Sequence, residues 1–245
     1  EYGLQALEAP LPGEDGEDPG VVGRRARDAG LTWIGYWSDD WITPEGGVGG
    51  LMARAERAFE TALRGGVETL VIFGRGDRHN RFTREPFLSE QLRIIPGHLR
   101  PLAEAAAELG VQLALLPHLD YRGRELVAVM QAVDHPALKM AFDSANPFPV
   151  CEEPIDAARA VLPHAVAVAL KDVQIFPYRS NEVTIWGTPL GRGAVDFSAI
   201  LPLMVELLPD LVRTTACIKL RFPPGSAEHA EWMKESLDFL RGSIG

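Results

Sequence analysis

The sequence is poor in cysteine and has no long apolar run. Two cysteines, Cys151 and Cys217, among 245 residues are too few for a disulfide framework. No stretch approaches the ~20 apolar residues of a membrane-spanning helix. The first ten residues, EYGLQALEAP, lack the basic region and the apolar core of a signal peptide. These absences argue against a membrane protein and fit a reducing cytoplasm.

Positive charge is also scarce. The formal net charge is −10, from 24 basic and 34 acidic residues, and no basic cluster or aromatic RNA-binding signature occurs. This composition predicts no binding to nucleic acid or to an anionic membrane. A small-molecule substrate is the expected partner, and a homo-oligomer is compatible with the composition.

Lysine is the rarer of the two strong cations. The chain has four lysines, and three of them, Lys139, Lys171 and Lys219, lie on predicted strands. Because arginine is the usual surface cation of this chain, lysines on strands need a specific reason. Two reasons stay open: a role in a site, or an ion pair and an aliphatic stem along the barrel wall.

What the sequence does contain is a regular alternation of short apolar strands and amphipathic helices, which predicts a parallel α/β fold in one domain, residues 1–245. The predicted strands cover residues 2–8, 31–37, 67–74, 111–118, 138–143, 166–172 and 215–221. The predicted helices cover residues 21–28, 51–63, 88–109, 125–133, 155–162 and 196–208, with a last helix near the C-terminus. The segment 88–109 forms one helix, or two that break near Pro96 and Gly97. A (β/α)8 TIM barrel needs eight strands, so either one strand escapes this count or the first βα unit lies upstream of Glu1.

Four of the strands end in ionisable side chains, and the pleat of a strand places alternate residues on one face. The smaller and more polar face is expected inside the barrel; it carries Gln112, Ala114, Leu116, His118, Lys139, Ala141, Asp143, Ala165, Ala167, Ala169, Lys171, Thr215, Cys217, Lys219 and Arg221. The larger apolar face is expected to meet the helices; it carries Leu113, Leu115, Met140, Phe142, Val166, Val168, Leu170, Ala216, Ile218 and Leu220. His118, Asp143, Lys171 and Lys219 are therefore predicted to converge at the carboxyl-end mouth, where barrels place their active sites.

Five segments in order, LALLPH, AFDSAN, VALKD, LGRGAVDF and CIKL, resemble the xylose isomerase-like TIM barrel superfamily of sugar phosphate isomerases and epimerases. In that family the segments typically read like LALENH, D-x-x-N/H, VHLKD, G-x-G-x-x-D and a strand that ends in Glu. The resemblance covers the last two-thirds of the chain. It implies a barrel, an isomerase or epimerase activity, and an N-terminus that falls on the family's second strand, with about 30 more residues upstream.

The chain departs from the family at the metal. The family's four ligands, Glu, Asp, His and Glu, fall on Leu116, Asp143, Ala169 and Lys219. Only Asp143 keeps a donor, so we expect no metal at the family position and no other cofactor. A divalent metal held by relocated ligands, for example Glu8, His118 and Asp143, is the alternative.

The candidate catalytic residues are Lys219, Asp143, His118 and Lys171. Lys219 either aims its ammonium at a substrate oxygen or, if burial and Lys171 lower its pKa, forms a Schiff base. Asp143 is the ion partner of Lys219, a general base, or both. His118 is an acid/base group that titrates near neutrality, or a mouth residue bonded to a backbone carbonyl.

A second group of residues is predicted to bind the substrate. The candidates are Glu8, Trp37, Arg75, Asn146, Asp172, Trp186, Arg192 and Arg221. Arg75 begins a basic loop that is either an anion-binding lip or a solvated segment; its other basic residues are Arg78, His79, Arg81 and Arg84. The backbone of Gly191, Arg192 and Gly193 either binds an anion or forms a plain turn before a helix that Asp196 caps.

These patterns predict an enzyme that isomerises, epimerises or cleaves a small polar carbonyl or hydroxy compound by metal-independent acid/base or lysine-assisted chemistry. Two alternatives stay open. One is a metal-dependent isomerase with relocated ligands, and the other is a barrel without chemistry that serves as a binding or scaffold subunit. The identity of the substrate is beyond the sequence.

Overall fold

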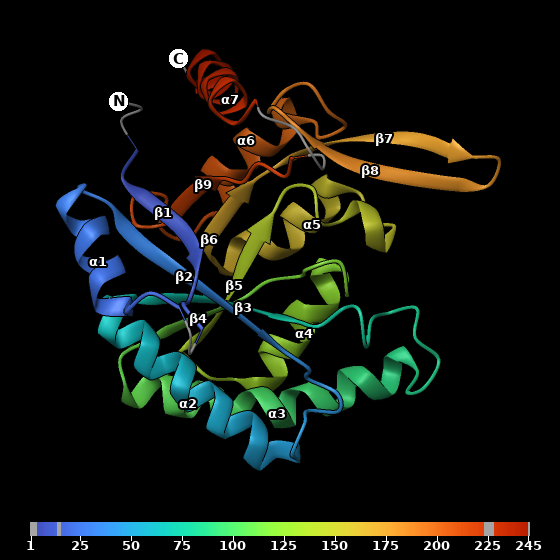
Figure 1. The fold of residues 1–245 in the computed structure, drawn as a ribbon. Helices are drawn as coiled ribbons and strands as arrows, with labels where there is room; N and C mark the ends of the chain where they lie inside the picture. Colours follow the sequence, from blue (N-terminus) through green and yellow to red (C-terminus); the bar gives the residue numbers. More distant parts are fainter. Residues whose placement is uncertain (1–3, 14–15, 223–227, 245) are drawn as a thin grey trace.

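A barrel of parallel strands forms the centre of the molecule (Figure 1). The computed structural model describes residues 4–13, 16–222 and 228–244. Within them, seven parallel strands form one sheet in the order β1-β2-β3-β4-β5-β6-β9. Their bounds are β1 Ala6–Pro10, β2 Thr32–Asp39, β3 Thr69–Gly74, β4 Gln112–Leu115, β5 Leu138–Asp143, β6 Ala165–Leu170 and β9 Thr215–Ile218. The predicted α/β class and the predicted count of seven barrel strands are confirmed.

Helices follow the strands and cover the outer face of the sheet (Figure 1). Their bounds are α1 Pro19–Asp28, α2 Gly47–Gly65, α3 Leu88–Glu108, α4 Gly123–Val133, α5 Pro154–Val161, α6 Phe197–Leu207 and α7 His229–Ile244. The segment 88–109, for which the sequence allows one helix or two, forms the single helix α3, which contains Pro96 and Pro101. Within the described part of the chain, none of the helices combines the length and the apolar character that a membrane crossing needs.

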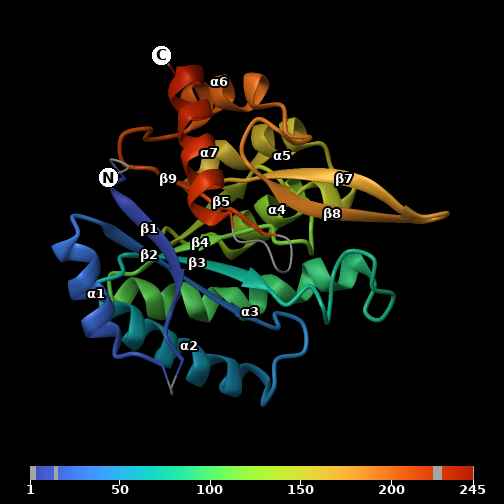
Figure 2. The same cartoon turned by 45° about the horizontal axis from the view of Figure 1, so that its top comes forward.

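An antiparallel hairpin between β6 and α6 was not predicted. Its strands are β7 Asp172–Arg179 and β8 Glu182–Thr188, and it projects away from the barrel (Figure 2). The sequence predicts no strand between 172 and 196 and carries the preceding strand through Asp172, whereas β6 ends at Leu170. The pattern was difficult to read because both faces of the hairpin carry apolar side chains, so it lacks the polar and apolar alternation of a half-buried strand.

The core has two layers, as the alternation of strand residues predicts. Leu113, Leu115, Met140 and Phe142 belong to the large cluster between the sheet and the helices. The barrel interior is filled by a smaller cluster: Ile34, Val71, Ala114, Leu116, Ala141 and Ala167.

Two residues at the start of β6 are reversed relative to the prediction. Ala165 packs in the outer cluster, whereas Val166 packs against the interior one. The cause is a β-bulge, since Met140 pairs with Ala165 but the next residue, Ala141, pairs with Ala167. The extra residue restarts the alternation, so the prediction holds again from Ala167 onward.

Candidate functional site at the carboxyl end of the barrel

Asp143, at the end of β5, forms a buried ion pair with Lys171. Its Oδ1 accepts hydrogen bonds from the backbone N–H groups of Ala145 at 2.9 Å and Asn146 at 3.0 Å. Its Oδ2 lies 3.0 Å from the Lys171 Nζ. That contact is an ion pair without hydrogen-bond geometry, because Oδ2 has no hydrogen-bond partner. The Lys171 ammonium instead donates a hydrogen bond to the side-chain oxygen of Asn146.

The ends of β5 and β6 are tied together beside this pair. The Ser144 hydroxyl accepts a hydrogen bond from the Lys171 N–H at 2.8 Å and donates one to the Lys171 carbonyl at 2.6 Å. The Asn146 side-chain amide donates to the Pro117 carbonyl at 3.1 Å. Because every one of these groups is buried or nearly so, the Lys171 ammonium has a fixed position at the mouth.

Glu8 of β1 faces β9 and forms the second ion pair of the mouth. Its Oε1 accepts a hydrogen bond from the Lys219 Nζ at 2.6 Å, and its Oε2 accepts one from the Cys217 thiol at 3.0 Å. The Lys219 Nζ also lies 5.3 Å from the ring centre of Tyr36, within cation–π range. The sequence leaves Asp143 open as the ion partner of Lys219, as a general base, or as both, and the structure gives Lys219 another ion partner. Glu8 pairs with Lys219, and Asp143 pairs with Lys171.

Lys219 is charged in this setting. Burial is the largest influence on its pKa and lowers it, but the charges of Glu8 and Asp143 and the hydrogen bond to Glu8 together outweigh burial and raise the pKa above its usual value. A Schiff base needs the neutral amine. The geometry therefore disfavours the Schiff-base alternative and favours a permanent ammonium.

His118, just after β4, stands among these charges. Its ring packs on Phe73, with 4.3 Å between the ring centres. Burial first, and then the positive charges of Lys171, Lys219 and Arg221, lower its pKa to about 4, against the opposing effect of Asp143. The imidazole is therefore neutral near pH 7. The sequence predicts a group that titrates near neutrality, whereas burial in the first place, and the surrounding cations in the second, lower the pKa of the imidazole.

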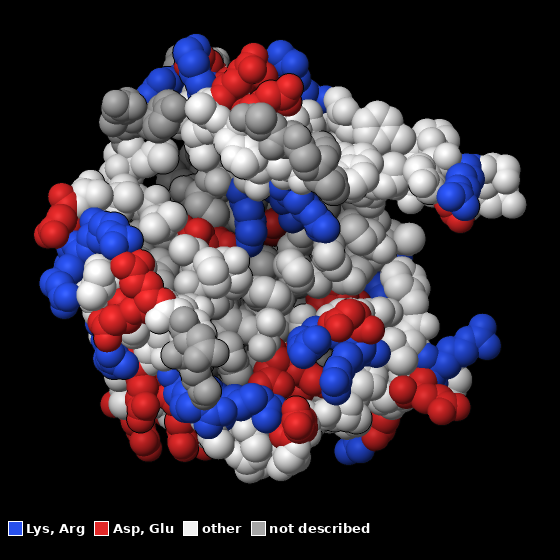
Figure 3. Space-filling view, in the orientation of Figure 1, with Lys and Arg blue, Asp and Glu red and all other residues white. Residues whose placement is uncertain are grey.

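The structure thus brings the four predicted catalytic residues and Arg221 to one mouth, with Glu8 and Asn146 beside them. Figure 3 shows basic and acidic side chains together in the hollow at the centre of one face. Tyr36 and Phe73 also pack against the interior cluster, and neither is among the residues predicted for the site. Applying the same alternation to residues 31–37 and 67–74 would have found them.

Asp172 forms hydrogen bonds with the loop that contains Gly191 and Gly193. The Asp172 carboxylate accepts hydrogen bonds from the backbone N–H groups of Gly191, Gly193, Val195 and Val173, at 2.8–3.1 Å. Burial raises the pKa of Asp172, and these hydrogen bonds oppose the rise. The N–H groups of Gly191 and Gly193 therefore already bind the protein's own carboxylate, which favours the plain turn over an anion site on this loop.

Four other candidates have partners outside the two ion pairs of the mouth. Arg75 pairs with Asp77 at 3.3 Å on the surface. Arg192 pairs with Glu235 of α7, also at the surface. Trp37 packs edge-on against Trp41 with the outer cluster, and Trp186 lies on the hairpin opposite Gln174.

The basic loop after β3 also pairs with neighbouring acids. His79 and Arg78 contact Asp40, and Arg81 contacts Glu125 at 3.2 Å. These contacts favour the reading in which the loop is a structural segment over an anion-binding lip.

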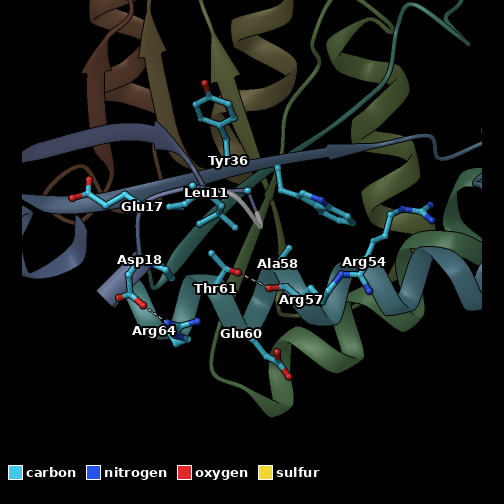
Figure 4. Close-up of a pocket in the computed structure, with 15 residues that line it drawn as sticks. Leu11, Glu17, Asp18, Tyr36, Arg54, Arg57, Ala58, Glu60, Thr61 and Arg64 are labelled. Carbon is cyan, nitrogen blue, oxygen red and sulfur yellow. Dashed lines mark hydrogen bonds and ion pairs between the residues drawn. The ribbon is translucent and has the colours of Figure 1, made fainter. Parts of the chain in front are cut away.

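One surface cavity is lined by none of the ionisable residues of the mouth. It has a volume of about 620 Å³ and lies between the chain after β1, the strand β2 and the helix α2. Figure 4 shows α2 residues such as Arg54, Ala58 and Thr61 along it, while the Tyr36 side chain points away from the helix. Arg54 and Arg64 on its wall are paired with Asp39 and Asp18. This cavity does not contain the cluster of ionisable groups found at the mouth.

A parallel barrel with charged groups at the carboxyl ends of its strands defines the class of TIM-barrel proteins. The chain matches the sequence model of the xylose isomerase-like TIM barrel family over residues 1–242, and it belongs to that family.

Solved structures show the same fold. A xylose isomerase domain protein from Planctomyces limnophilus superposes with a TM-score of 0.76 at 18% identity, covering 99% of this chain and 89% of that one. An L-ribulose 3-epimerase gives 0.75 at 15% identity, with 99% and 85% coverage. An IolI protein with a bound zinc atom gives 0.70 at 16% identity, with 99% and 87% coverage.

One curated relative also matches this chain. It is the uncharacterized protein YihM of Escherichia coli K12, which is 26% identical over 164 residues. The match covers 67% of this chain and 48% of the relative, so it spans about half of the relative's length.

Zinc and magnesium occur in solved relatives, so the residues of this chain must be tested against a metal. At the family's ligand positions, Leu116 packs in the barrel interior and Ala169 is a buried methyl group. Lys219 is a cation already paired with Glu8. Among the described residues, no group of three or more His, Cys, Asp or Glu side chains is placed to hold a metal ion. The donor set does not fit the family metal, and Glu8, His118 and Asp143 are not gathered into a replacement.

Proposed function

We propose that this chain is an isomerase- or epimerase-like enzyme that moves a proton on a small polar carbonyl or hydroxy compound without the family metal. One observation carries the proposal. Two lysine–carboxylate pairs, Asp143 with Lys171 and Glu8 with Lys219, surround a neutral imidazole at the mouth of the barrel. Membership of a family whose solved relatives include a sugar epimerase supports the reaction class.

The chemistry follows from the charge of each group. A neutral His118 is in the form that accepts a proton from a carbon next to a carbonyl. The proton loss leaves negative charge on the carbonyl oxygen, which a fixed ammonium stabilises in a buried site. Lys171 and Lys219 supply two such ammonium groups, and their carboxylate partners hold them in place. Asp143 and Glu8 are thus positioning residues for the two lysines in this scheme.

The test is exchange of the substrate proton with solvent. The protein is incubated in D2O with a panel of aldoses, ketoses and their phosphates, and loss of the proton signal is followed by NMR. We expect exchange with at least one compound, a drop of at least about a hundredfold in His118→Asn and Lys219→Gln, and no effect of a chelator. Lys234→Gln, on the exposed face of α7, is the matched lysine control and should behave as the parent does.

Two other outcomes would replace the proposal. Activity that a chelator removes and a metal restores would identify a metal-dependent isomerase with relocated ligands. Saturable binding of a sugar with no exchange, even at long incubation, would identify a barrel that binds without chemistry. Because both mouth carboxylates are paired with cations, a barrel that binds without chemistry is favoured over a metal-dependent isomerase.

A further inference from the structure

We infer that the mouth of the barrel contains a binding site for an anionic group, a carboxylate or a phosphate, which Arg221 holds together with Lys171 and Lys219. As an assignment of substrate class, the inference rests on the proposed function. As an assignment of a binding site, it stands without turnover.

The first argument is the charge balance of the mouth. Lys171 is neutralised by Asp143 at 3.0 Å, and Lys219 is neutralised by Glu8 at 2.6 Å. Arg221 is exposed and forms no ion pair with any described residue. Among Glu8, Asp143, Lys171, Lys219 and Arg221 the cations outnumber the anions by one, in a chain whose net charge is −10. A local excess of the minority charge in a hollow attracts an ion of the opposite sign.

The pKa of His118 indicates the sign of the electrostatic potential inside the hollow. Three cations, Lys171, Lys219 and Arg221, lower its pKa, and one anion, Asp143, raises it. The charges that act on the imidazole are therefore positive in sum. An anion bound among them would offset the cations and make His118 a stronger base at the moment when the substrate is present.

The third argument is that the fold fixes the backbone of Arg221. A Cβ atom built on Gly187 of β8 would lie 1.8 Å from the Arg221 carbonyl oxygen. No side chain fits in that space, so the base of the hairpin lies directly on the backbone that carries the guanidinium. This contact gives the β7–β8 hairpin a role in placing Arg221 at the mouth.

The experiment uses the full chain and two probes, inorganic phosphate and glycolate, with chloride as the ionic-strength control. The His118 ring signal is identified by its loss in His118→Asn, and its pKa is followed by NMR as each probe is added. We expect saturable binding that raises the pKa of His118 from about 4. The probe that binds with the lower dissociation constant shows whether the site prefers a phosphate or a carboxylate.

Variants connect the binding to Arg221. Arg221→Gln should weaken the binding of the anion at least about tenfold, since a charge-assisted contact is lost. Gly187→Ala should weaken it by displacing the Arg221 backbone, with the circular dichroism spectrum preserved. The control is Arg93→Gln on the surface of α3, which should bind as the parent does.

Two results would overturn the inference: neither probe moves the His118 signal beyond the effect of chloride, or Arg221→Gln binds as tightly as the parent. Failure of the proposed function gives a different pattern, with saturable anion binding and no proton exchange on any compound. Turnover of an uncharged sugar that is unaffected by Arg221→Gln would leave the proposed function intact and remove the anionic substrate class.

Discussion

Glu8 and Lys219 join the two edges of the barrel sheet, with 2.6 Å between Oε1 and Nζ. Glu8 lies on β1, whose ladder is with β2, and Lys219 follows β9, whose ladder is with β6. Within the described residues no backbone ladder connects β1 to β9, although the two strands lie side by side (Figure 1). The Glu8 side chain is 9% exposed and that of Lys219 31%. A partly buried ion pair therefore closes the barrel at the point where it also builds the mouth.

We expect Glu8→Gln to destabilise the fold by about 1–3 kcal/mol, because it leaves the Lys219 ammonium partly buried without its counter-charge. The double variant Glu8→Gln/Lys219→Gln should recover part of that loss, giving a coupling energy of about 1 kcal/mol or more in a double-mutant cycle measured by urea denaturation. The exposed pair Lys234 and Asp238 on α7 provides the control cycle, with an expected coupling below about 0.5 kcal/mol. Equal coupling energies in the two cycles would mean that the Glu8–Lys219 pair stabilises the fold no more than a surface ion pair does.

Asp120, in the loop after β4, should make stability fall as pH rises. It is fully buried, and burial raises its pKa to about 7 despite hydrogen bonds from the backbone N–H groups of His118 and Tyr121. Its Oδ2 has no hydrogen-bond partner and faces Gly74. Between about pH 4 and pH 7 the folded state holds a proton that the unfolded state has released, so the free energy of unfolding decreases across that window.

The size of the effect follows from the difference in pKa. At 1.36 kcal/mol per pKa unit the loss is on the order of 4 kcal/mol by pH 8. Asp120→Asn cannot ionise, so the difference in unfolding free energy between pH 5 and pH 8 should shrink by about 2–3 kcal/mol in that variant. Urea denaturation of both proteins at the two pH values measures it. The same pH dependence in parent and variant would show that Asp120 titrates normally.

Asp172 should matter for the loop that precedes α6 more than for any ligand. Asp172→Ala removes the acceptor of four backbone N–H groups, three of them in the segment from Gly191 to Val195. We expect a loss of about 2–4 kcal/mol, because buried donors are left without partners. Hydrogen exchange should show faster amide exchange at those residues, and Asp172→Asn, which keeps one oxygen, should lie in between. Unchanged exchange in the alanine variant would contradict this role.

The sequence predicts most of the barrel and less of the mouth, and the reason is the range of the interactions. The phase of β4 and β5 follows from local alternation, so Leu116 and Asp143 were placed on the inner face without knowledge of the rest of the chain. The pairing of Glu8 with Lys219 joins residues 211 positions apart and depends on how the barrel closes. No local sequence pattern predicts which residues meet where the barrel closes.

Two further misses have the same kind of origin. The family pattern suggested the carboxylate of Asp172 as a ligand for substrate, and only the folded loop shows that backbone groups already occupy it. The pKa of His118 depends on burial and on the cations that follow β6 and β9. Residue type indicates which groups can titrate, but their neighbours decide the protonation state.

The final prediction concerns metal binding. A metal site of the family type needs about three or more protein donors, and of the four family positions only Asp143 provides one. The Lys219 ammonium would repel a divalent ion about 4 Å away by several kcal/mol at an effective dielectric of about 20. We therefore expect the purified protein to take up no stoichiometric zinc, manganese or magnesium, as measured by elemental analysis after dialysis against each ion.

The matched gain-of-function variant is Ala169→His/Lys219→Glu, which removes the cation and adds two donors, one on β6 and one just after β9. Ala169 pairs with Asp143 and with Cys217 across the sheet, so the new donors would lie beside the remaining carboxylate. We expect this variant to bind zinc or manganese with a micromolar or tighter dissociation constant in a calorimetric titration, and the single variant Ala169→His to bind far more weakly. Stoichiometric metal in the parent protein that Asp143→Asn abolishes would show that the lysine does not exclude the ion, and that the family's metal chemistry persists with other donors.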